Sequence, residues 1–420
     1  MSGPRSACDL CPRRCGADRA AGERGACGAG RALVVARAAL HFWEEPPISG
    51  ERGSGAVFFA HCPLRCVYCQ NALIAAGEAG AEVSVGRLSE MLLELAAQGA
   101  LNVNLVTPTH YAPEARSAVA AARAEGLSLP VVWNTSGYET VEALRANAGT
   151  VDVYLSDFKY ADAALAARYS HAPDYPEVAI KALEAMVDEV GAPAFDEVDG
   201  MPRLVRGVVV RHLALPGALE DSKRVVRLVR EHFGDEVLLS LMNQYTPVVA
   251  ASAAAGDARA ARALGRCPEL AGRVSGEDYE RLLDYADGLG IEDYFWQEGG
   301  SAEESFIPPF DLTGVRERSR AWAGERGRGE SRASRFGVGR QGARSALRRA
   351  EGRASRRGAQ GAMRGACALR DAWREAAGAR RHGAGAGERD PLRLPRVSGT
   401  APLRGCARAS RRCSSTGASA

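Results

Sequence analysis

Three closely spaced cysteines form the pattern in this sequence that points most directly to chemistry, Cys62-x3-Cys66-x2-Cys69. Three thiolates on one loop can bind three irons of a cubane 4Fe–4S cluster, for which cysteine is the usual ligand. The fourth iron then has no protein ligand, and an open coordination position separates a catalytic metal site from a structural one. The alternatives are a zinc site and three cysteines without a shared role. The position of the triplet, directly after a buried apolar run, favours the cluster.

Four further cysteines near the N-terminus, Cys8, Cys11, Cys15 and Cys27, form a complete set of ligands. Four thiolates close a coordination sphere, so this group predicts a structural zinc or a second, fully ligated iron–sulfur cluster. The spacing does not separate zinc from iron, and ordinary thiols in a leader are the third alternative. The Pro12-Arg13-Arg14 insert adds positive charge that would stabilise an anionic metal–thiolate centre. The other cysteines are isolated: Cys267, Cys367, Cys406 and Cys413.

The elements that must position these cysteines alternate along the chain. Six apolar runs have the character of strands buried on both faces: 56–60, 101–106, 130–133, 151–155, 204–210 and 236–241. Segments with helical spacing lie between them: 85–98, 112–125, 141–147, 175–190 and 219–233. This alternation predicts an α/β fold with a parallel sheet and right-handed crossovers. Six strands fit a partial (β/α)6 TIM-like barrel better than a complete barrel of eight.

A polar cluster follows each of the six expected strands. The clusters are 61–70, 107–111, 134–137, 156–159, 211–217 and 243–247. Because ligands of parallel sheets bind at the carboxyl ends of the strands, we expect these clusters to form one site. Turn residues alone would explain one or two such clusters, and six at one edge indicate a binding site.

The net charge of +3 for 420 residues hides two opposite regions. Residues 316–420 contain 26 arginines, no lysine and 8 acidic residues, a net charge of +18, whereas the rest of the chain carries −15. The same tail has only 8 Leu, Ile, Val or Phe residues in 105, too few to bury a core. We therefore expect a Cys-rich module at 1–45, a catalytic core with a C-terminal extension at 46–315, and a disordered Arg/Gly/Ala-rich tail at 316–420.

The tail resembles RNA-binding disordered segments in composition, but its lack of Lys and Ile also fits translation of GC-rich DNA outside the true frame. The acidic body argues against a general nucleic-acid binder, since phosphate contacts need clustered cations. The sequence has no apolar run of the length of a membrane span and no apolar stretch of signal-peptide type at its N-terminus. We expect a cytoplasmic monomer without a membrane or specific nucleic-acid partner.

The segment Cys62-Pro-Leu-Arg-Cys66-Val-Tyr-Cys69 resembles the signature of the radical S-adenosylmethionine (SAM) superfamily, including the aromatic residue before the third cysteine. The finer resemblance is to proteins related to the pyruvate formate-lyase activating enzyme, in the branch with an extra N-terminal cysteine cluster. It covers about residues 5–315. The stretches that carry it are 104–111, 157–160, 212–217, 241–247 and 306–315.

The resemblance implies a role for each matching residue. Cys62, Cys66 and Cys69 would bind the cluster, whose open iron is chelated by SAM, and Tyr68 would contact the adenine. Many relatives have a glycine-rich stretch after the second strand, where this chain has Thr107-Pro108-Thr109-His110. The hydroxyls of Thr107 and Thr109, or a backbone carbonyl, would then accept the hydrogen bonds of SAM. His110 is a candidate catalytic residue facing the substrate, and the alternative is a structural histidine that only makes hydrogen bonds. Further positions match SAM-binding residues of the family: Asn134, Thr135, Asp157, Lys159 and His212.

The activity implied by the resemblance is reductive cleavage of SAM to a 5′-deoxyadenosyl radical. The first hypothesis for its target is a glycyl-radical enzyme, with flavodoxin or ferredoxin as the electron donor. The second is an oxidoreductase or transferase reaction on a small molecule or a protein side chain. A non-catalytic iron–sulfur protein is the third, although an electron carrier needs no SAM pocket. The sequence does not identify the substrate.

Overall fold

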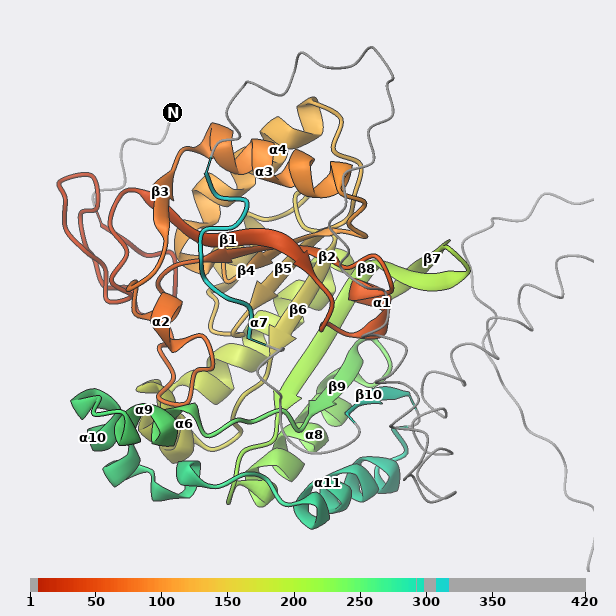
Figure 1. Cartoon of the computed structure of the whole chain (residues 1–420). Coiled ribbons are helices and arrows are strands. Elements are labelled where there is room, and N and C mark those ends of the chain that lie inside the picture. The colour runs from red at the N-terminus through yellow and green to blue at the C-terminus, as the bar shows by residue number, and fades with distance from the viewer. Residues whose placement is uncertain (1–6, 292, 298–306, 317–420) are drawn as a thin grey trace, which may run out of the picture. The chain divides into compact units, whose positions relative to one another are not determined.

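One large sheet forms the framework of the protein. The computed structural model describes residues 7–291, 293–297 and 307–316, and within them the strands follow the order β10-β9-β8-β6-β5-β4-β2-β1-β3, with β7 paired to β8 (Figure 1). All pairs from β2 to β10 along this order are parallel, whereas β1 runs antiparallel to β2 and β3 antiparallel to β1. The strands are β1 (Leu33–His41), β2 (Ser54–Phe59), β3 (Ala81–Val83), β4 (Val103–Val106), β5 (Val131–Thr135), β6 (Val153–Asp157), β7 (Ala194–Val198), β8 (Met201–Leu213), β9 (Leu238–Met242) and β10 (Tyr294–Trp296).

Most of the helices lie between successive parallel strands, whereas α1 lies between the antiparallel strands β1 and β2. They are α1 (Pro46–Ser49), α2 (Ala72–Ala75), α3 (Val85–Ala97), α4 (Ala112–Ala124), α5 (Val141–Arg145), α6 (Ala163–Ser170), α7 (Tyr175–Val190), α8 (Leu219–Phe233), α9 (Val248–Ala254), α10 (Ala258–Arg266) and α11 (Gly276–Gly288), with short 3-10 helices η1 (Thr109–Tyr111) and η2 (Pro268–Ala271). The expected α/β fold and partial TIM-like barrel are confirmed, since each of the six predicted strands overlaps one of β2, β4, β5, β6, β8 and β9.

Helix α3 illustrates how the local sequence builds these elements. The Ser84 hydroxyl accepts a hydrogen bond from the Arg87 N–H and so caps the first turn. Leu88, Leu92 and Leu95 recur at helical spacing and are buried against the sheet. An amphipathic segment of this kind can only cover one face of the sheet, which fixes where the helix packs.

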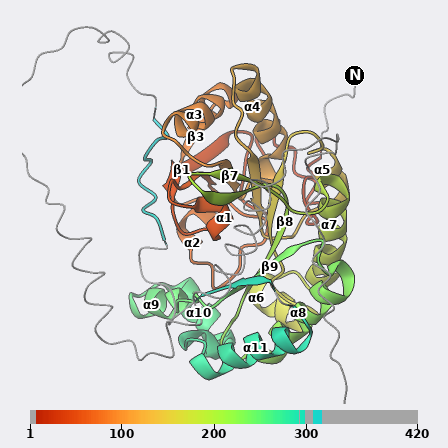
Figure 2. The same ribbon diagram turned by 90° about the vertical axis from the view of Figure 1, so that its right-hand side faces the viewer.

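The two faces of the parallel sheet differ in what they contact. Val131 and Trp133 of β5 belong to the large apolar core shared with α3, α4, α7 and α8, and Figure 2 shows α4, α5, α7 and α8 following one another around the outside of the strands. Val132, between them, packs with Ile48 of α1 on the opposite face. We call the α1 side the inner face. Because side chains alternate along a strand, Asn134, Asp157 and Arg211 fall on the inner face.

Segments from both ends of the described chain pack against the main sheet. Strand β1 lies within the 1–45 module of the sequence-based division and pairs with β2 of the main sheet. Residues 307–316 pack along β1, where the Ala38 N–H donates to the Thr313 carbonyl. The expected tail lies outside the described residues from 317 onward.

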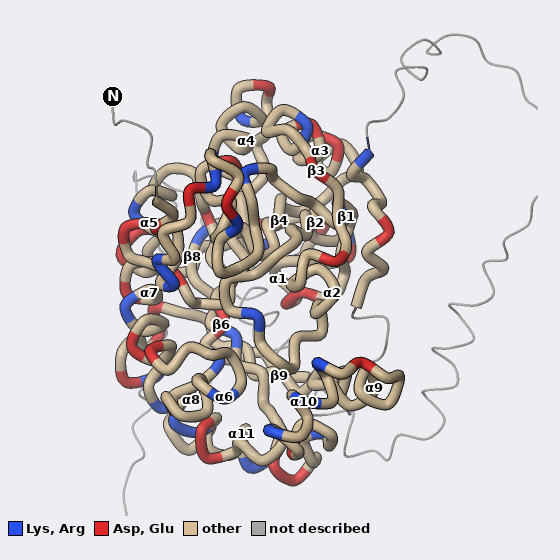
Figure 3. Tube along the Cα trace, turned by 90° about the vertical axis from the view of Figure 1, so that its left-hand side faces the viewer, with Lys and Arg blue, Asp and Glu red and all other residues tan. Residues whose placement is uncertain are grey.

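The surface charges of the described residues are mixed in sign. Figure 3 shows Lys and Arg interspersed with Asp and Glu over α5, α7 and α8. Among the described helices, none combines the length and the apolar character that crossing a membrane requires.

Candidate functional site

The cysteine triplet lies in the loop that follows β2, at the carboxyl edge of the parallel sheet. His61 and Arg65 adopt left-handed backbone angles, with φ of 70° and 51°, and so turn the chain sharply around Cys62. All three thiols are partly buried. Burial raises the pKa of Cys69 to about 12, with Cys66 and Cys62 acting in the same sense. The three sulfurs are therefore close neighbours.

A cluster and a single metal ion make different demands on the three thiols. Among the described residues, no three His, Cys, Asp or Glu side chains surround a single ion position. In a cubane cluster each thiolate binds a different iron, so its ligands need not converge on one point. The triplet thus has the donor chemistry and the loop placement of a cluster site.

Cys66 begins a chain of hydrogen bonds that runs into an aromatic cluster. The Ser170 hydroxyl donates to Cys66 Sγ at 3.1 Å and lies 2.7 Å from the Tyr160 hydroxyl. Tyr160 and Tyr68 share a further hydrogen bond of 2.7 Å. The Tyr68 ring is buried in edge contacts with Tyr160, Tyr169 and Tyr245. This packing holds the end of the cysteine loop next to Cys69. Contact of Tyr68 with adenine stays a prediction.

An ionic network occupies the inner face below the cysteine loop. The Lys159 ammonium lies 2.6 Å from Asp157 Oδ2, and the Arg211 guanidinium lies 3.0 Å from Asp157 Oδ1. Although burial raises the pKa of Asp157, Lys159 and Arg211 together hold it below its ordinary value. The network keeps a carboxylate ionised between two cations.

Lys159 also connects this network with the cysteines. Burial disfavours its charge, but Asp157 and then Cys66 raise its pKa. In return, Lys159 opposes the effect of burial on the pKa of both Cys62 and Cys69. The structure therefore brings together Asp157, Lys159 and the three cysteines, all of which the sequence singled out.

Arg211 and Glu44 complete the network. Arg211 was expected at the site only as part of the polar cluster 211–217, without a role of its own, and Glu44 was not predicted. Arg211 lies 3.1 Å from Glu44 Oε2 and donates to Asn134 Oδ1 at 2.6 Å. Asn104 also donates to Glu44 at 3.0 Å. Arg211 directly follows an apolar strand, a signal that could have identified it. Glu44 lies in the loop before α1, and its sequence context carries no comparable signal.

Two of the expected SAM-binding threonines have another partner. The hydroxyls of Thr109 and Thr135 each donate to Glu139 Oε1 at 2.6 Å, and Trp133 Nε1 lies 3.4 Å from the same atom. Burial raises the pKa of Glu139. Thr109 and Thr135 are thus placed on the helix side of the sheet rather than on the inner face, while Thr107 is half-buried at the end of β4.

The two histidines of the predicted site are buried and bonded to the backbone. His110 Nε2 lies 2.8 Å from the Ala60 carbonyl, and burial lowers the pKa of His110 to about 3. His212 Nδ1 lies 2.8 Å from the Phe158 carbonyl, and burial lowers its pKa to about 4. Both rings are neutral at physiological pH. His212 Nε2 is buried without a hydrogen-bond partner in the described structure.

The N-terminal cysteines converge around Gly25. A Cβ at Gly25 would lie 3.3 Å from Cys27 Sγ and 3.4 Å from Cys15 Sγ. Cys8 and Cys15 influence each other through a hydrogen bond between their side chains, and burial raises the pKa of Cys11 to about 12. Cys15 is thus close to Cys27 at Gly25 and is hydrogen-bonded to Cys8.

Arginine side chains of this N-terminal segment contact the backbone of the cysteine loop and of the residues around it. Arg13, between Cys11 and Cys15, donates to the Pro63 carbonyl at 3.1 Å and to the Ser170 carbonyl at 2.8 Å. Arg19 donates to the His110 carbonyl at 2.6 Å and contacts Cys27 Sγ at 3.5 Å. The two cysteine groups are therefore joined by arginine side chains.

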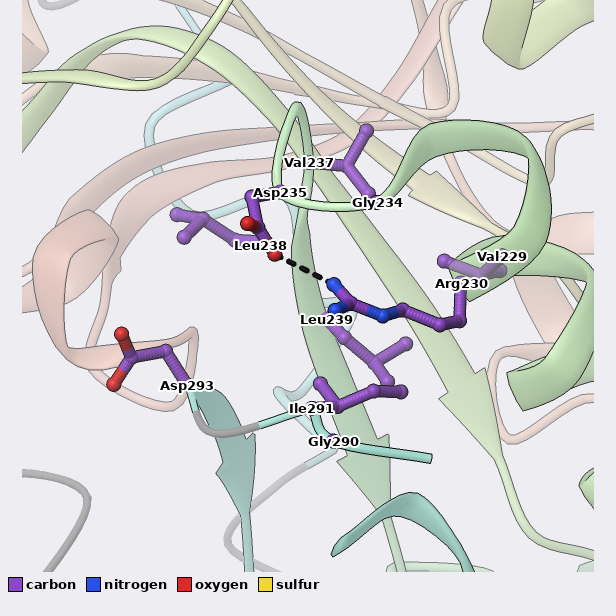
Figure 4. A pocket seen from close by; sticks show the side chains of 10 residues that line it. All are labelled: Val229, Arg230, Gly234, Asp235, Val237, Leu238, Leu239, Gly290, Ile291 and Asp293. Carbon is purple, nitrogen blue, oxygen red and sulfur yellow. Dashed lines mark hydrogen bonds and ion pairs between the residues drawn. The ribbon is translucent and has the colours of Figure 1, made fainter. Parts of the chain in front are cut away.

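A cavity of about 390 Å³ lies elsewhere, between the end of α8, the start of β9 and Gly290 and Ile291 (Figure 4). Leu238 and Leu239 are the first residues of β9, so the cavity is at the amino end of the parallel strands. Its Arg230 is paired with Asp235 at 2.6 Å. The cavity has no connection with the cysteine loop.

Comparison with known proteins finds a distant relative in sequence. No family model matches the chain. An uncharacterized protein of Methanocaldococcus jannaschii is 25% identical over 294 residues, which cover 68% of this chain and 75% of the relative.

Two solved structures are similar in fold. A radical SAM methyltransferase from Sphaerobacter thermophilus has a TM-score of 0.39 and 14% identity over 59% of this chain and 67% of that chain. SuiB of Streptococcus suis, bound to the precursor peptide SuiA, has a TM-score of 0.37 and 16% identity over 56% of this chain and 46% of that chain. Both similarities are weak and concern the fold alone.

Proposed function

We propose that this chain is a radical SAM enzyme, which binds a 4Fe–4S cluster through Cys62, Cys66 and Cys69 and cleaves SAM reductively. The observation that carries the proposal is the position of the cysteine loop. It follows β2 at the carboxyl edge of a parallel sheet, beside Lys159 and Asp157. Ligands of such sheets bind at this edge, and three thiolates leave one iron of a cubane without a protein ligand.

The surrounding side chains fit such a pair of cofactors. An ammonium group next to the cysteine loop can pair with the carboxylate of SAM. His212 Nε2 and Asn104 Oδ1 are buried acceptors without partners among the described residues. Because an unpaired buried acceptor is costly, groups that donate hydrogen bonds, such as the amino and ribose hydroxyl groups of SAM, would satisfy acceptors of this kind.

When bound, the cluster and SAM would supply the difficult chemistry, which is one-electron cleavage of the sulfonium C–S bond and abstraction of hydrogen from the substrate. The chain's own residues bind and orient. Lys159 would pair with the carboxylate of SAM, and Asp157 positions the Lys159 ammonium at 2.6 Å. Arg211 in turn fixes Asp157, so the whole set is preorganised.

The finer proposal concerns the target of the radical. We propose a glycyl-radical enzyme as the partner and flavodoxin or ferredoxin as the electron donor, supported by the resemblance of the cysteine loop to activating enzymes. Hydrogen transfer to 5′-deoxyadenosine from a glycine-labelled partner would support it. If no glycyl-radical enzyme transfers its label to 5′-deoxyadenosine, an oxidoreductase or transferase reaction on another substrate is favoured. If the protein does not cleave SAM at all, it is a non-catalytic iron–sulfur protein.

We also propose a second metal centre at Cys8, Cys11, Cys15 and Cys27. The convergence of thiols at Gly25 and the Arg19 guanidinium beside Cys27 support an anionic metal–thiolate centre. If it is an iron–sulfur cluster, anaerobic reconstitution should give about eight irons per chain, whereas a zinc site gives about four irons and one zinc. Replacing all four cysteines by Ala with no loss of metal would contradict both versions.

The experiment on the main proposal is anaerobic. The protein is reconstituted with iron and sulfide, reduced with dithionite and mixed with SAM, and 5′-deoxyadenosine is quantified by chromatography. The Cys66→Ala variant should give none, because two thiolates do not hold a cubane stably. Cys267→Ala, which removes an isolated buried cysteine, is the matched control and should keep the iron and the product. A fully loaded cluster whose paramagnetic resonance signal ignores SAM and which yields no product would refute the proposal.

A further inference from the structure

Ser170 is the last residue of α6 and is completely buried beside the cysteine loop. Its hydroxyl has two partners, Cys66 Sγ at 3.1 Å and the Tyr160 hydroxyl at 2.7 Å. A thiolate bound to iron has no proton and can only accept. Ser170 must therefore donate to Cys66. Each hydroxyl has one proton, so with the cluster bound Tyr160 would donate to Ser170 and Tyr68 would donate to Tyr160, the reverse of the Tyr160-to-Tyr68 direction in the structure. The direction of the Ser170 O–H bond is fixed by its surroundings.

The backbone of Ser170 is held as firmly as its hydroxyl. The Ser170 carbonyl accepts a hydrogen bond of 2.8 Å from Arg13, which also donates to the Pro63 carbonyl next to Cys62. The following residue, His171, ends α6 in a left-handed conformation with φ of 53° and bonds back to the last turn. Ser170 thus cannot turn away from Cys66 without breaking contacts with the N-terminal cysteine group.

We propose that Ser170 is a positioning residue that sets the reduction potential of the cluster through its hydrogen bond to Cys66. This inference rests on the proposed function, because it requires the cluster. When the oxidised cluster takes up one electron, its negative charge increases and is shared by the thiolate sulfurs. A donated hydrogen bond stabilises that extra charge, and hydrogen bonds to sulfur are one of the means by which proteins tune such clusters. No proton is transferred, since Ser170 keeps its hydrogen.

The expected consequence is an easier reduction of the cluster in the wild-type protein. Removing the hydroxyl should lower the midpoint potential, so a stronger reductant is needed. Removing the Tyr160 hydroxyl should have a smaller effect in the same direction, because Ser170 still donates but loses the partner that polarises it. Neither effect depends on turnover.

The test is a redox titration of the reconstituted protein, followed by electron paramagnetic resonance without SAM. Ser170→Ala should shift the midpoint to a more negative potential at unchanged iron content, and the reduced cluster should lose one deuterium-exchangeable proton coupling. Ser170→Thr keeps the hydroxyl and should restore both properties. Ser89→Ala removes a buried hydroxyl that has no hydrogen-bond partner among the described residues, and it should change neither.

Several outcomes would overturn the inference. An unchanged midpoint and proton coupling in Ser170→Ala would do so. So would an equal shift in Ser170→Thr, because packing rather than the hydroxyl would then set the potential. If Ser170→Ala does not retain iron, Tyr160→Phe decides, and an unchanged midpoint there overturns the relay. Failure of the wild-type protein to form any cluster at its three cysteines would instead refute the proposed function.

Discussion

Arg211 and Asp157 are register partners on the neighbouring parallel strands β8 and β6, and their side chains form an ion pair of 3.0 Å on the inner face. Their side chains are only 13% and 17% exposed. The same guanidinium contacts Glu44 and Asn134. One cation therefore joins the three strands β5, β6 and β8 to the loop that precedes α1.

Replacing Arg211 by Met should destabilise the protein strongly. The variant leaves the Asp157 and Glu44 carboxylates buried with less compensating charge, and breaking a buried ion pair from one side typically costs about 3–5 kcal/mol. Urea unfolding of the metal-free protein measures the loss. Lys181→Ala is the control, since Lys181 and its partner Glu177 are exposed and should contribute nothing measurable. Equal unfolding midpoints for the two variants would show that the inner network does not stabilise the fold.

Replacing Lys159 by Ala should weaken SAM binding while the cluster is kept. Loss of a charge-assisted contact is worth about 1.5–3 kcal/mol, or about ten- to a hundredfold in affinity. Titration of SAM into the reduced protein, followed by paramagnetic resonance, gives the dissociation constant. Lys181→Ala, at an exposed lysine of α7, is the matched control. Unchanged affinity at full iron content would remove Lys159 from the binding site.

The secondary structure was predictable because its signals are local. The predicted segments 175–190 and 219–233 have the bounds of α7 and α8, whose apolar spacing and first-turn acids define them. The six central strands were recognisable as apolar runs. Strands β1 and β10 were not, because an antiparallel partner and a short edge strand leave no distinct periodicity.

The candidate site was predictable only in part, because its contacts join distant residues. The cysteine spacing identified its centre. The pairing of Arg211 with Glu44 spans 167 positions, and no sequence pattern encodes it. The hydroxyls of Thr109 and Thr135 were expected at SAM, whereas Glu139 accepts both. The polar residue at a strand end could be recognised, but the face on which its side chain lies follows from the packing of the whole sheet.

The stability of the protein should fall as the pH drops below about 6.5. Burial lowers the pKa of His110 to about 3 and those of His41 and His212 to about 4. These groups stay neutral in the folded protein, while the unfolded chain takes up protons below the ordinary histidine pKa of about 6.5. The contribution of these histidines to the free energy of unfolding is complete above that pH. It is lost as the pH falls toward their pKa values in the folded protein, by about 1.4 kcal/mol per pH unit for each histidine.

The His110→Gln variant isolates one of these contributions. Gln keeps a donor for the Ala60 carbonyl but does not titrate. Between pH 6 and 4 its unfolding free energy should depend on pH less steeply than that of the wild type, by about 1.4 kcal/mol per unit. Parallel curves for wild type and His110→Gln would contradict the assignment of a neutral, structural His110.

The segment 307–316 is bound to the sheet by contacts that few residues could make. Arg87 donates to the carbonyls of Gly314 and Val315 at 3.1 and 3.2 Å, and Arg37 pairs with Asp311 at 2.9 Å. Gly314 has a φ of +72°, and a Cβ there would lie 2.0 Å from the Ala38 carbonyl oxygen. Only glycine fits this close approach of two backbones.

Truncation and substitution should therefore separate this segment from the tail. Deleting residues 317–420 should leave the thermal midpoint unchanged, because the tail is too poor in apolar residues to support a core. Deleting from 307 onward should lower it, since Arg87 and Arg37 lose their partners. In the chain that ends at residue 316, Gly314→Ala should lower the free energy of unfolding by at least about 1 kcal/mol, up to the free energy of undocking the segment 307–316. Gly288→Ala, near the end of α11 with open space around it, should not destabilise. A loss of several degrees on deleting 317–420 would show that the tail packs on the sheet.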